Sequence, residues 1–458
     1  MIVPTDNVCV YDLLNVDTVV ATKAAITRAI GKIYSNSNIG KVIDSVESQF
    51  QAEEQSAEEA EIAERVDNAP IVKLCTTIVE NSFRANATDI HIEPFKTYTR
   101  IRIRVNGDLI ELMNVSNVVH NSLITRIKII SGMNIAEKRV PQDGRFTQVV
   151  DGTTLDVRVS NLPTVNGEKC VIRILATGDV GVRKITDLGM TPYNYDRFSR
   201  LIKVPQGVML VTGPTGSGKS TTLYTSLSEL NKEDVNIITV EDPVEANING
   251  INQVQVNNKA DMTFAAALRS ILRQDPDIIM IGEIRDGETA QIAVQAAITG
   301  HLVVSTLHTN SAASTITRLE DMGIEPYVVG DAVVGVIAQR LVRRLCPTCK
   351  QPRLVEDEER IVLGVPEDEE DVIIYEPSGC PLCNDTGYSG RIGVYEMMPV
   401  SKALQAVIST GATADKIEKQ ALAEGMLTLK MGAAKHVLNG ITSMSEMKKI
   451  VYTTGDEY

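Results

Sequence analysis

Residues 207–222 read GVMLVTGPTGSGKSTT, an apolar run followed by a glycine-rich segment and the start of a helical pattern. The run Val208–Thr212 is typical of a buried strand, and the next segment fits the phosphate-binding pattern GxxxxGK[ST] without deviation. Glycines let backbone N–H groups turn toward phosphate oxygens, and a helix N-terminus favours anions. A glycine-rich turn without a ligand is the alternative, which this context disfavours. The predicted phosphate-binding residues are Gly213, Pro214, Thr215, Gly216, Ser217, Gly218, Lys219, Ser220 and Thr221.

Two side chains of this segment have specific expected partners. Lys219 should reach the β- and γ-phosphates of a nucleotide, and the Ser220 hydroxyl should ligate Mg²⁺. The motif therefore predicts a nucleoside triphosphate and Mg²⁺ as ligands.

Short apolar runs alternate with helical patterns around this segment. The runs are Val208–Thr212, Asn236–Val240, Ile278–Ile281 and Leu302–Thr306, and the helical patterns include Thr221–Leu230 and Thr289–Ala297. Such alternation predicts an α/β domain with a parallel sheet covered by helices. Ligands of open parallel sheets bind at the carboxyl ends of the strands. Polar residues that follow each run are therefore candidates for the site.

The third run lies in residues 272–286, LRQDPDIIMIGEIRD, and the carboxylate Glu283 follows it. Many phosphate-loop enzymes end this strand in an aspartate that holds the Mg²⁺ shell, whereas Gly282 stands there in this chain. We therefore predict that Glu283 is the general base or positions the attacking water. Arg273 and Arg285 are predicted to form ring-interface or strand-edge ion pairs.

Acidic residues follow the second run, and histidines bracket the fourth. Glu241, Asp242 and Glu245 are candidates for support of the metal; helix capping and solvated turn acids are the alternatives. His301 and His308 are predicted to sense the nucleotide state or order the site from near the same edge of the sheet. Plain packing is the alternative for the histidines, and no third ligand is spaced for zinc.

Residues 66–180 mix helical and strand patterns and are predicted to form an α+β domain. Residues 100–105, RIRIRV, alternate as a half-buried strand does, and Asn106-Gly107 follows as a hairpin signal. Leu155–Val159 and Val171–Leu175 also have the pattern of strands.

The other segments complete the predicted organisation of the 458 residues. Residues 1–65 are predicted to be a short N-terminal segment whose acidic end is a linker or a solvated helix. Residues 181–345 form the α/β domain, residues 346–395 a cysteine-containing subdomain, and residues 396–458 a helical region.

Composition excludes some classes of function. The net charge of −14 argues against bulk nucleic-acid binding, which needs clustered positive charge. No apolar run reaches the ~18 residues of a membrane span, and the N-terminus lacks the pattern of a signal peptide, so a cytoplasmic protein is expected.

The local cluster Arg340, Arg343 and Arg344 is predicted to be a solvated helix face or to contact acids within a ring. A patch for a membrane partner or anionic lipid is the alternative.

Four of the seven cysteines form two CxxC pairs. Each pair can present two thiolates to one tetrahedral Zn²⁺, and a site with four protein ligands is closed and structural. A disulfide is disfavoured in a cytosolic chain. The predicted zinc ligands are Cys346, Cys349, Cys380 and Cys383.

The motifs together resemble those of secretion ATPases of the type II secretion and type IV pilus assembly class. Those that match, in order, are TDIHIEP at 88–94, AEKRVPQDGR at 136–145, the phosphate loop, Thr239–Glu245, Leu272–Asp286 and Gly300–Asn310. The resemblance covers roughly residues 66–450. It implies a RecA-like P-loop ATPase domain preceded by a PAS-like α+β domain, with a zinc-binding insertion and C-terminal helices.

The resemblance also implies a mechanism and partners. In that family a homo-hexamer hydrolyses ATP, and arginines of one α+β domain approach the γ-phosphate held by the next subunit. Arg158 and Arg173 occupy the matching strands, and Arg145 is a further candidate. An inner-membrane platform protein is the implied partner, with peripheral association at the cytoplasmic face of the inner membrane and no nucleic acid. The four-cysteine insertion resembles assembly ATPases, so pilus assembly is predicted, with type II secretion as the alternative.

Four other interpretations stay open from the sequence. Pilus retraction is disfavoured by the cysteine pairs, and conjugation-type DNA transfer by the net acidity. A scaffold that binds ATP without hydrolysis is disfavoured because Lys219, Ser220 and Glu283 are all present. Regulation by a signalling dinucleotide at residues 1–65 lacks the expected glycine-and-glutamine pattern.

Overall fold

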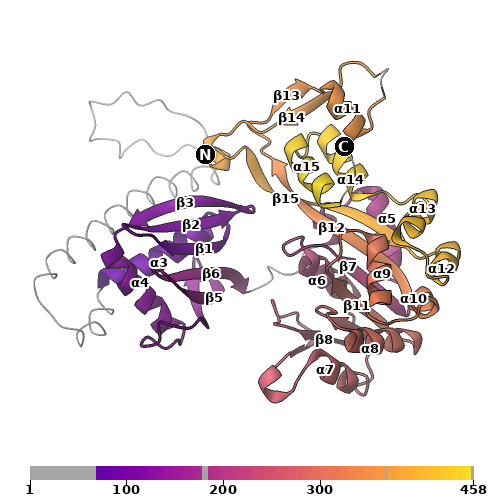
Figure 1. Cartoon of the computed structure of the whole chain (residues 1–458), viewed down its shortest axis with the longest axis horizontal. Coiled ribbons are helices and arrows are strands. Elements are labelled where there is room, and N and C mark those ends of the chain that lie inside the picture. Colours follow the sequence, from indigo (N-terminus) through magenta and orange to yellow (C-terminus); the bar gives the residue numbers. More distant parts are fainter. Residues whose placement is uncertain (1–68, 178–183, 367–368, 455–458) are drawn as a thin grey trace, which may run out of the picture. The chain divides into compact units, whose positions relative to one another are not determined.

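The computed structural model of the chain describes residues 69–177, 184–366 and 369–454. The chain divides into two compact units, with the boundary between Leu175 and Ala176, and each unit has its own sheet (Figure 1). The predictions for residues 1–65 lie outside the described residues. Within those ranges, no helix has the length and the apolar character needed to cross a membrane.

Among the described residues, the first unit contains a six-stranded sheet and two helices, which confirms the α+β prediction. The strand order is β3-β2-β1-β6-β5-β4. Asn106 and Gly107 have φ of 52° and 99° and join β2 to β3, as the hairpin signal predicted. The elements are α3 (Ala69–Arg84), β1 (Ala87–Pro94), β2 (Thr99–Val105), β3 (Asp108–Val115), α4 (Asn117–Ile130), β4 (Gln142–Val150), β5 (Thr153–Thr164) and β6 (Gly167–Thr177).

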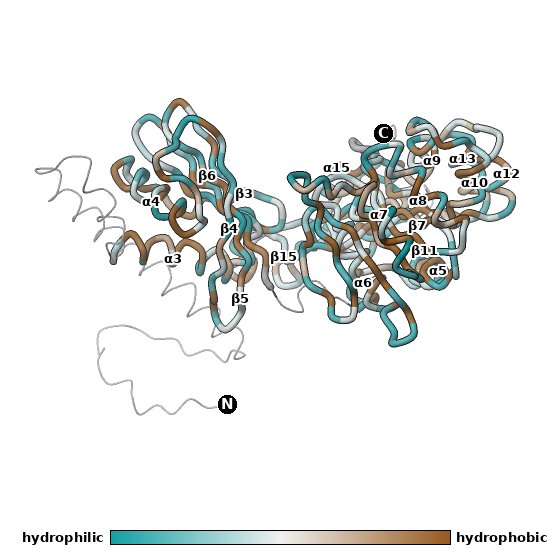
Figure 2. Tube along the Cα trace, turned by 90° about the horizontal axis from the view of Figure 1, so that it is seen from below, coloured by the Kyte–Doolittle hydropathy of each residue, from teal (hydrophilic) through white to brown (hydrophobic). Residues whose placement is uncertain are grey.

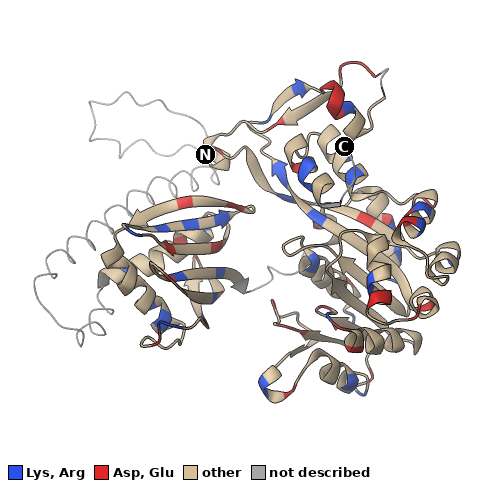
Figure 3. Ribbon diagram, in the orientation of Figure 1, with Lys and Arg blue, Asp and Glu red and all other residues tan. Residues whose placement is uncertain are grey.

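Alternation along β2 separates an apolar face from a charged face. Ile101 and Ile103 are buried, whereas Arg100 and Arg102 are only half-buried. Figure 3 shows basic residues, in blue, along β2. Helix α3 contacts both β1 and α4 and buries its apolar face, including Leu74. The core of this unit therefore lies between the helices and the apolar face of the sheet.

The second unit contains a seven-stranded sheet of order β15-β12-β7-β11-β10-β8-β9. The four predicted runs correspond to β7 (Gly207–Thr212), β8 (Ile237–Glu241), β10 (Ile278–Ile281) and β11 (Leu302–Leu307). They pair in parallel, which confirms the predicted α/β class. The sheet continues through β9 (Asn252–Gln255) at one edge, and through β12 (Val333–Leu345) and the antiparallel β15 (Tyr388–Pro399) at the other.

Both faces of this sheet are buried, which explains why its strands are continuous apolar runs. Along β7, Val208 and Leu210 belong to one core, and Met209 and Val211 to another. Figure 2 shows apolar stretches along β7 and β11. The first core includes residues of α7 (Phe264–Ile271), α8 (Gly287–Ile298), α9 (Ala312–Asp321) and α10 (Pro326–Ala332), and the second those of α5 (Pro192–Leu201) and α6 (Lys219–Leu230).

The helix predicted for the arginine cluster is wrong. Arg340, Arg343 and Arg344 lie on β12, which pairs with β7 and β15. Their spacing of three and four residues imitates a helical face, but the strand is held by its neighbours in the sheet. The prediction of helices from residue 396 onward is also wrong at its start, because β15 continues to Pro399.

The rest of the C-terminal part is helical, as predicted. Its helices are α12 (Lys402–Ile408), α13 (Ala414–Ala423), α14 (Leu429–Leu438) and α15 (Met444–Thr454). The cysteine segment between β12 and β15 contributes β13 (Gln351–Leu354), α11 (Asp357–Leu363) and β14 (Ile373–Glu376).

Candidate functional site

The phosphate-binding segment joins the carboxyl end of β7 to the first turn of α6. Gly213, Gly216 and Gly218 have φ of 148°, 79° and 90°, a region that favours glycine. A Cβ on Gly213 would lie 2.5 Å from the carbonyl oxygen of Gln339, so the loop backbone packs directly on β12. A Cβ on Gly216 would meet nothing within 4 Å. The loop is therefore supported from behind and open in front.

This loop has the groups that a phosphate needs. Lys219 Nζ donates to Gly213 O (2.8 Å) and Pro214 O (3.1 Å), so the ammonium group folds over the loop. The Ser217 hydroxyl is buried and has no hydrogen-bond partner among the described residues. Ser220 is half-buried at the second position of α6. These residues fit a nucleotide with Mg²⁺, because the donors converge at a helix N-terminus.

Glu283 is held at the same edge of the sheet by its neighbours. Gly282 N donates to Val240 O of β8 (2.8 Å), and Ile284 N donates to Thr306 O of β11 (3.0 Å). A Cβ on Gly282 would lie 3.3 Å from the Cα of Glu241. This close approach leaves little room for a side chain at this position, where many phosphate-loop enzymes have aspartate.

Charged groups surround the Glu283 carboxylate. Arg285 donates a hydrogen bond to it and also lies 3.8 Å from Asp242, which confirms the predicted strand-edge ion pairs of Arg285. His308 Nε2 lies 3.5 Å from Glu283 Oε2. Burial and the charge of Lys219 lower the pKa of His308, against the effect of Glu283. The carboxylate therefore faces the Arg285 guanidinium and an imidazole whose lowered pKa favours the neutral form.

Electrostatics link Lys219 to the same group of residues. Burial lowers the pKa of Lys219, and Arg340 acts in the same direction. Glu283 and Glu245 oppose both effects. The two carboxylates are therefore close enough to act on the ammonium group. The parallel register brings residues from the ends of β7, β8 and β10 to one edge.

Glu241 is an anchoring group inside the unit. Only 4% of the residue is exposed, and its carboxylate accepts from Thr239 Oγ1 (2.6 Å), Gln253 Nε2 (3.0 Å) and the Tyr224 hydroxyl. Tyr224 also accepts from Glu245 N (3.1 Å). Tyr224 thus ties α6 to the acidic turn after β8. Sequence analysis missed it, because a tyrosine inside an apolar helix face carries no signal of a site.

The prediction that both histidines lie near one edge is wrong for His301. His308 directly follows β11, whereas His301 directly precedes it, and Leu302 pairs with Gly207 at the start of β7. A six-residue strand spans about 20 Å, so its two ends lie on opposite edges. His301 Nδ1 is bonded to Ala296 O (2.8 Å) at the end of α8, which is a packing role.

Two neighbours of the loop on β12 were not predicted as site residues. Gln339 is 1% exposed; it accepts from Thr222 Oγ1 (2.8 Å) and donates to Ser217 O (2.7 Å). Arg340 is buried, and Arg343 forms an ion pair with Glu446 (2.9 Å). The arginine cluster is therefore divided between internal contacts and the exposed Arg344, and it is not one basic surface patch.

The four predicted cysteine ligands form one cluster. All four sulfurs lie within 4.8 Å of one another, with pairs at 3.7, 3.8 and 3.9 Å. Sulfurs bound to Zn²⁺ at about 2.3 Å in a tetrahedron are about 3.8 Å apart. Backbone N–H groups of Gly379 and Gly387 donate to Cys349 Sγ and Cys383 Sγ. Distances and donors both fit a closed tetrahedral metal site.

Comparison with known proteins agrees with this site. The model of the family described as Type II/IV secretion system protein matches residues 64–449. This chain belongs to that family. The Type II secretion system ATPase E of Vibrio cholerae is 48% identical over 401 residues, which cover 88% of this chain and 79% of that protein. The Type IV pilus assembly ATPase PilB of Myxococcus xanthus is 44% identical over 442 residues, covering 94% and 77%.

Solved structures show the same fold as this secretion ATPase. The Legionella pneumophila ATPase DotB has a TM-score of 0.61 at 22% identity and covers 82% of this chain and 95% of its own. The pilus retraction motor PilT with bound ADP has a TM-score of 0.57 at 24% identity, covering 81% and 95%. The chain therefore has the predicted RecA-like fold.

The predicted trans arginines of the secretion ATPase lie on the strands of the first unit. Arg158 on β5 is directly opposite Arg145 on β4, and its Nε is 3.7 Å from Asp156. Arg173 on β6 has a largely exposed side chain, and its Nε donates to Asp89 Oδ1 (3.0 Å). Both arginines therefore lie on the sheet of the first unit, on β5 and β6.

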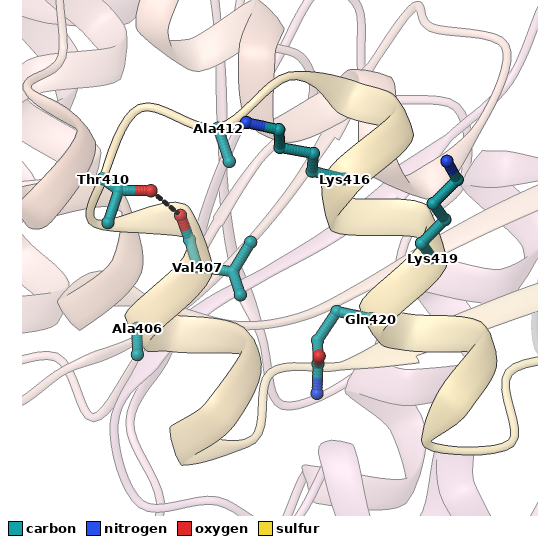
Figure 4. A pocket seen from close by; sticks show the side chains of 7 residues that line it. All are labelled: Ala406, Val407, Thr410, Ala412, Lys416, Lys419 and Gln420. Carbon is teal, nitrogen blue, oxygen red and sulfur yellow. Dashed lines mark hydrogen bonds between the residues drawn. The ribbon is translucent and has the colours of Figure 1, made fainter.

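A separate groove lies between α12 and α13 and has a volume of about 530 Å³. Figure 4 shows Val407 and Gln420 on facing helices and Lys416 beside Ala412. None of its lining residues belongs to the phosphate-binding loop or the acidic turn. The groove therefore takes no part in the site described above.

Proposed function

We propose that this secretion ATPase hydrolyses ATP at the loop Gly213–Thr221 with Glu283 as general base. The observation that supports this most is the convergence of Lys219, Glu283 and His308 at one edge of the sheet. Lys219 would neutralise the β- and γ-phosphates, and Ser220 would hold Mg²⁺, which adds charge stabilisation when bound.

In the proposed step, a water oxygen attacks the γ-phosphorus while Glu283 takes one of its protons. The bond to the β-γ bridging oxygen breaks, and ADP and phosphate are the products. Arg285 and His308 contact the carboxylate and would fix its orientation toward the water. Glu241, which is saturated with hydrogen bonds, would act by holding the turn that carries Asp242 and Glu245.

Phosphate release from the purified chain tests this proposal. We expect measurable turnover in the native protein, a strong loss in Glu283→Gln and a loss of nucleotide binding in Lys219→Ala. Arg200→Ala is a suitable control, because its exposed guanidinium pairs with Asp196 on its own helix α5. Equal, near-zero rates for native protein and Glu283→Gln would show a binding protein instead of an enzyme.

We further propose a homo-hexamer in which Arg158 and Arg173 act on the nucleotide of the next subunit. A trans arginine neutralises charge in the transition state and is worth about 10³–10⁵ in rate in other nucleotide hydrolases. The exposed guanidinium of Arg173 supports this role. Mixing Arg173→Ala with Lys219→Ala subunits tests it, because a ring of both retains competent mixed interfaces. A strict monomer with full activity would contradict the proposal.

The work proposed for this motor is assembly of a type IV pilus at the inner membrane through a platform protein, with the pseudopilus of type II secretion as the alternative. Relatives named for both processes are 44% and 48% identical, and the tetracysteine cluster, proposed to bind structural Zn²⁺, supports an assembly motor. Deletion of the gene in its source organism separates the two. Loss of surface pili supports the first process, and loss of secreted proteins with pili intact supports the second.

A further inference from the structure

Arg340 is a buried cation without a salt bridge in the described part of the chain. Only 5% of the residue is exposed. Its guanidinium donates to neutral acceptors, Gln339 O (3.1 Å) and Asn310 O (3.0 Å), and its Nε has no hydrogen-bond partner there. Glu396 acts on it only as a more distant charge. A buried charge without a counter-ion is costly, because burial removes its hydration.

The position of this cation is directly behind the phosphate loop. Nη1 lies 3.2 Å from where a Cβ on Gly213 would stand. The other arm of the guanidinium reaches Asn310, in the turn that follows β11 and carries His308. Its positive charge also contributes to the lowered pKa of Lys219. Arg340 therefore lies beside the phosphate loop and is hydrogen-bonded to the turn after β11, the two segments that border the proposed nucleotide.

We propose that Arg340 is a positioning residue whose counter-charge is the nucleotide's phosphate group, so that its buried positive charge favours the nucleotide-bound state. This inference rests on the proposed binding of ATP at Gly213–Thr221. The free chain bears the cost of the buried guanidinium, and the bound phosphates offset it. Arg340 thereby also links the phosphate loop to the turn of His308 without touching the reacting atoms.

The test is a comparison of stability and affinity in the full chain, with ADP and Mg²⁺ as the probe. Arg340→Met keeps most of the volume and removes the charge. We expect its melting temperature without nucleotide to equal or exceed that of the native chain, because removing a buried charge that has no counter-ion among the described residues offsets the loss of its hydrogen bonds to Gln339 O and Asn310 O. We expect its ADP affinity to fall about ten- to twentyfold, the order for one charge at roughly 10 Å and an effective dielectric constant of about 20.

The same strand offers a matched control in Arg343, whose ion pair with Glu446 is well formed. Arg343→Met should lower the melting temperature, since the buried Glu446 carboxylate loses the hydrogen bonds of the guanidinium and keeps Lys449 as its ion-pair partner, and should leave ADP affinity unchanged. Arg340→Lys should retain most of the affinity because it retains the charge.

Each outcome decides between the proposals. An Arg340→Met variant that loses stability or does not fold, or that binds ADP as tightly as the native chain, overturns the role of Arg340. A native chain that binds ADP no better than Lys219→Ala overturns the proposed nucleotide site itself. The two failures are distinguishable, because only the second is seen in the native protein.

Discussion

The Tyr224→Phe variant removes one hydroxyl that ties the phosphate-binding helix to the acidic turn after β8. The Tyr224 residue is 3% exposed; its hydroxyl donates to Glu241 and accepts from Glu245 N (3.1 Å). Burial and Glu241 both raise its pKa, so the group stays protonated as a donor. Because the ring is kept, the variant isolates the two hydrogen bonds from any change in packing.

The size of the effect follows from the partners that remain. A hydrogen bond to a charged group contributes about 1.5–3 kcal/mol, and a neutral one about 0.5–1.5 kcal/mol. Glu241 keeps Thr239 and Gln253 as donors, so the carboxylate stays partly solvated by the protein. We therefore expect a loss of about 2–3 kcal/mol in the free energy of unfolding. For a unit of this size that lowers the melting temperature by about 4–10 °C.

Thermal unfolding of the full chain, followed by circular dichroism, measures this loss. Tyr195→Phe is the control, since that side chain is half-exposed on α5 and makes no hydrogen bond within the described residues. The Michaelis constant for ATP should also rise in Tyr224→Phe, because the turn that carries Asp242 becomes less ordered. A melting temperature indistinguishable from that of the control would refute the reasoning.

Three other predictions address the site, the metal and the first unit. Glu283→Gln should lower kcat about 10²–10⁴-fold with little change in the Michaelis constant, as measured by phosphate release, because a general base acts only in the chemical step. Cys349→Ser should lose bound zinc and melt earlier, whereas Cys75→Ser, a buried thiol outside the cluster, should keep it in elemental analysis. Burial raises the pKa of Glu93, but the hydrogen bonds from Arg102 and Lys169 outweigh it and lower the pKa to about 2. The ionised Glu93 carboxylate therefore stabilises the first unit by on the order of 3 kcal/mol above pH 4.5, and this stabilisation is lost as the pH falls toward 2. In Glu93→Gln, the free energy of unfolding of the first unit should therefore depend less on pH between 4.5 and 2.

Prediction from sequence succeeded where the decisive pattern is local. The run before Gly213, the loop and the start of α6 are contiguous, so strand, turn and helix could be predicted together. The same holds for Asn106-Gly107, whose backbone preference alone selects the hairpin. The two cysteine pairs could be assigned to one zinc site because four thiols in two CxxC pairs typically bind Zn²⁺, and in the structure their sulfurs do converge.

Prediction failed where a residue's role depends on its neighbours in the sheet. Arg340 lies three and four residues before two other arginines, which imitates a helical face, yet β12 is a strand because β7 and β15 pair with it. His301 and His308 look equivalent around one strand, but they precede and follow the six residues of β11, whose length places them at opposite edges of the sheet.

The sequence by itself determined that this secretion ATPase has a phosphate loop at Gly213–Thr221, the carboxylate Glu283 after the apolar run Ile278–Ile281, and four cysteines in two CxxC pairs. Only the tertiary structure decided that Gln339 and Arg340 support the loop from behind and that Tyr224 anchors the acidic turn. The physical reason is that strand order and register bring together polar groups over 100 residues apart, as Thr222 and Gln339 are. A local sequence pattern reports the period of one element, and it carries no information about which buried partner lies across the sheet.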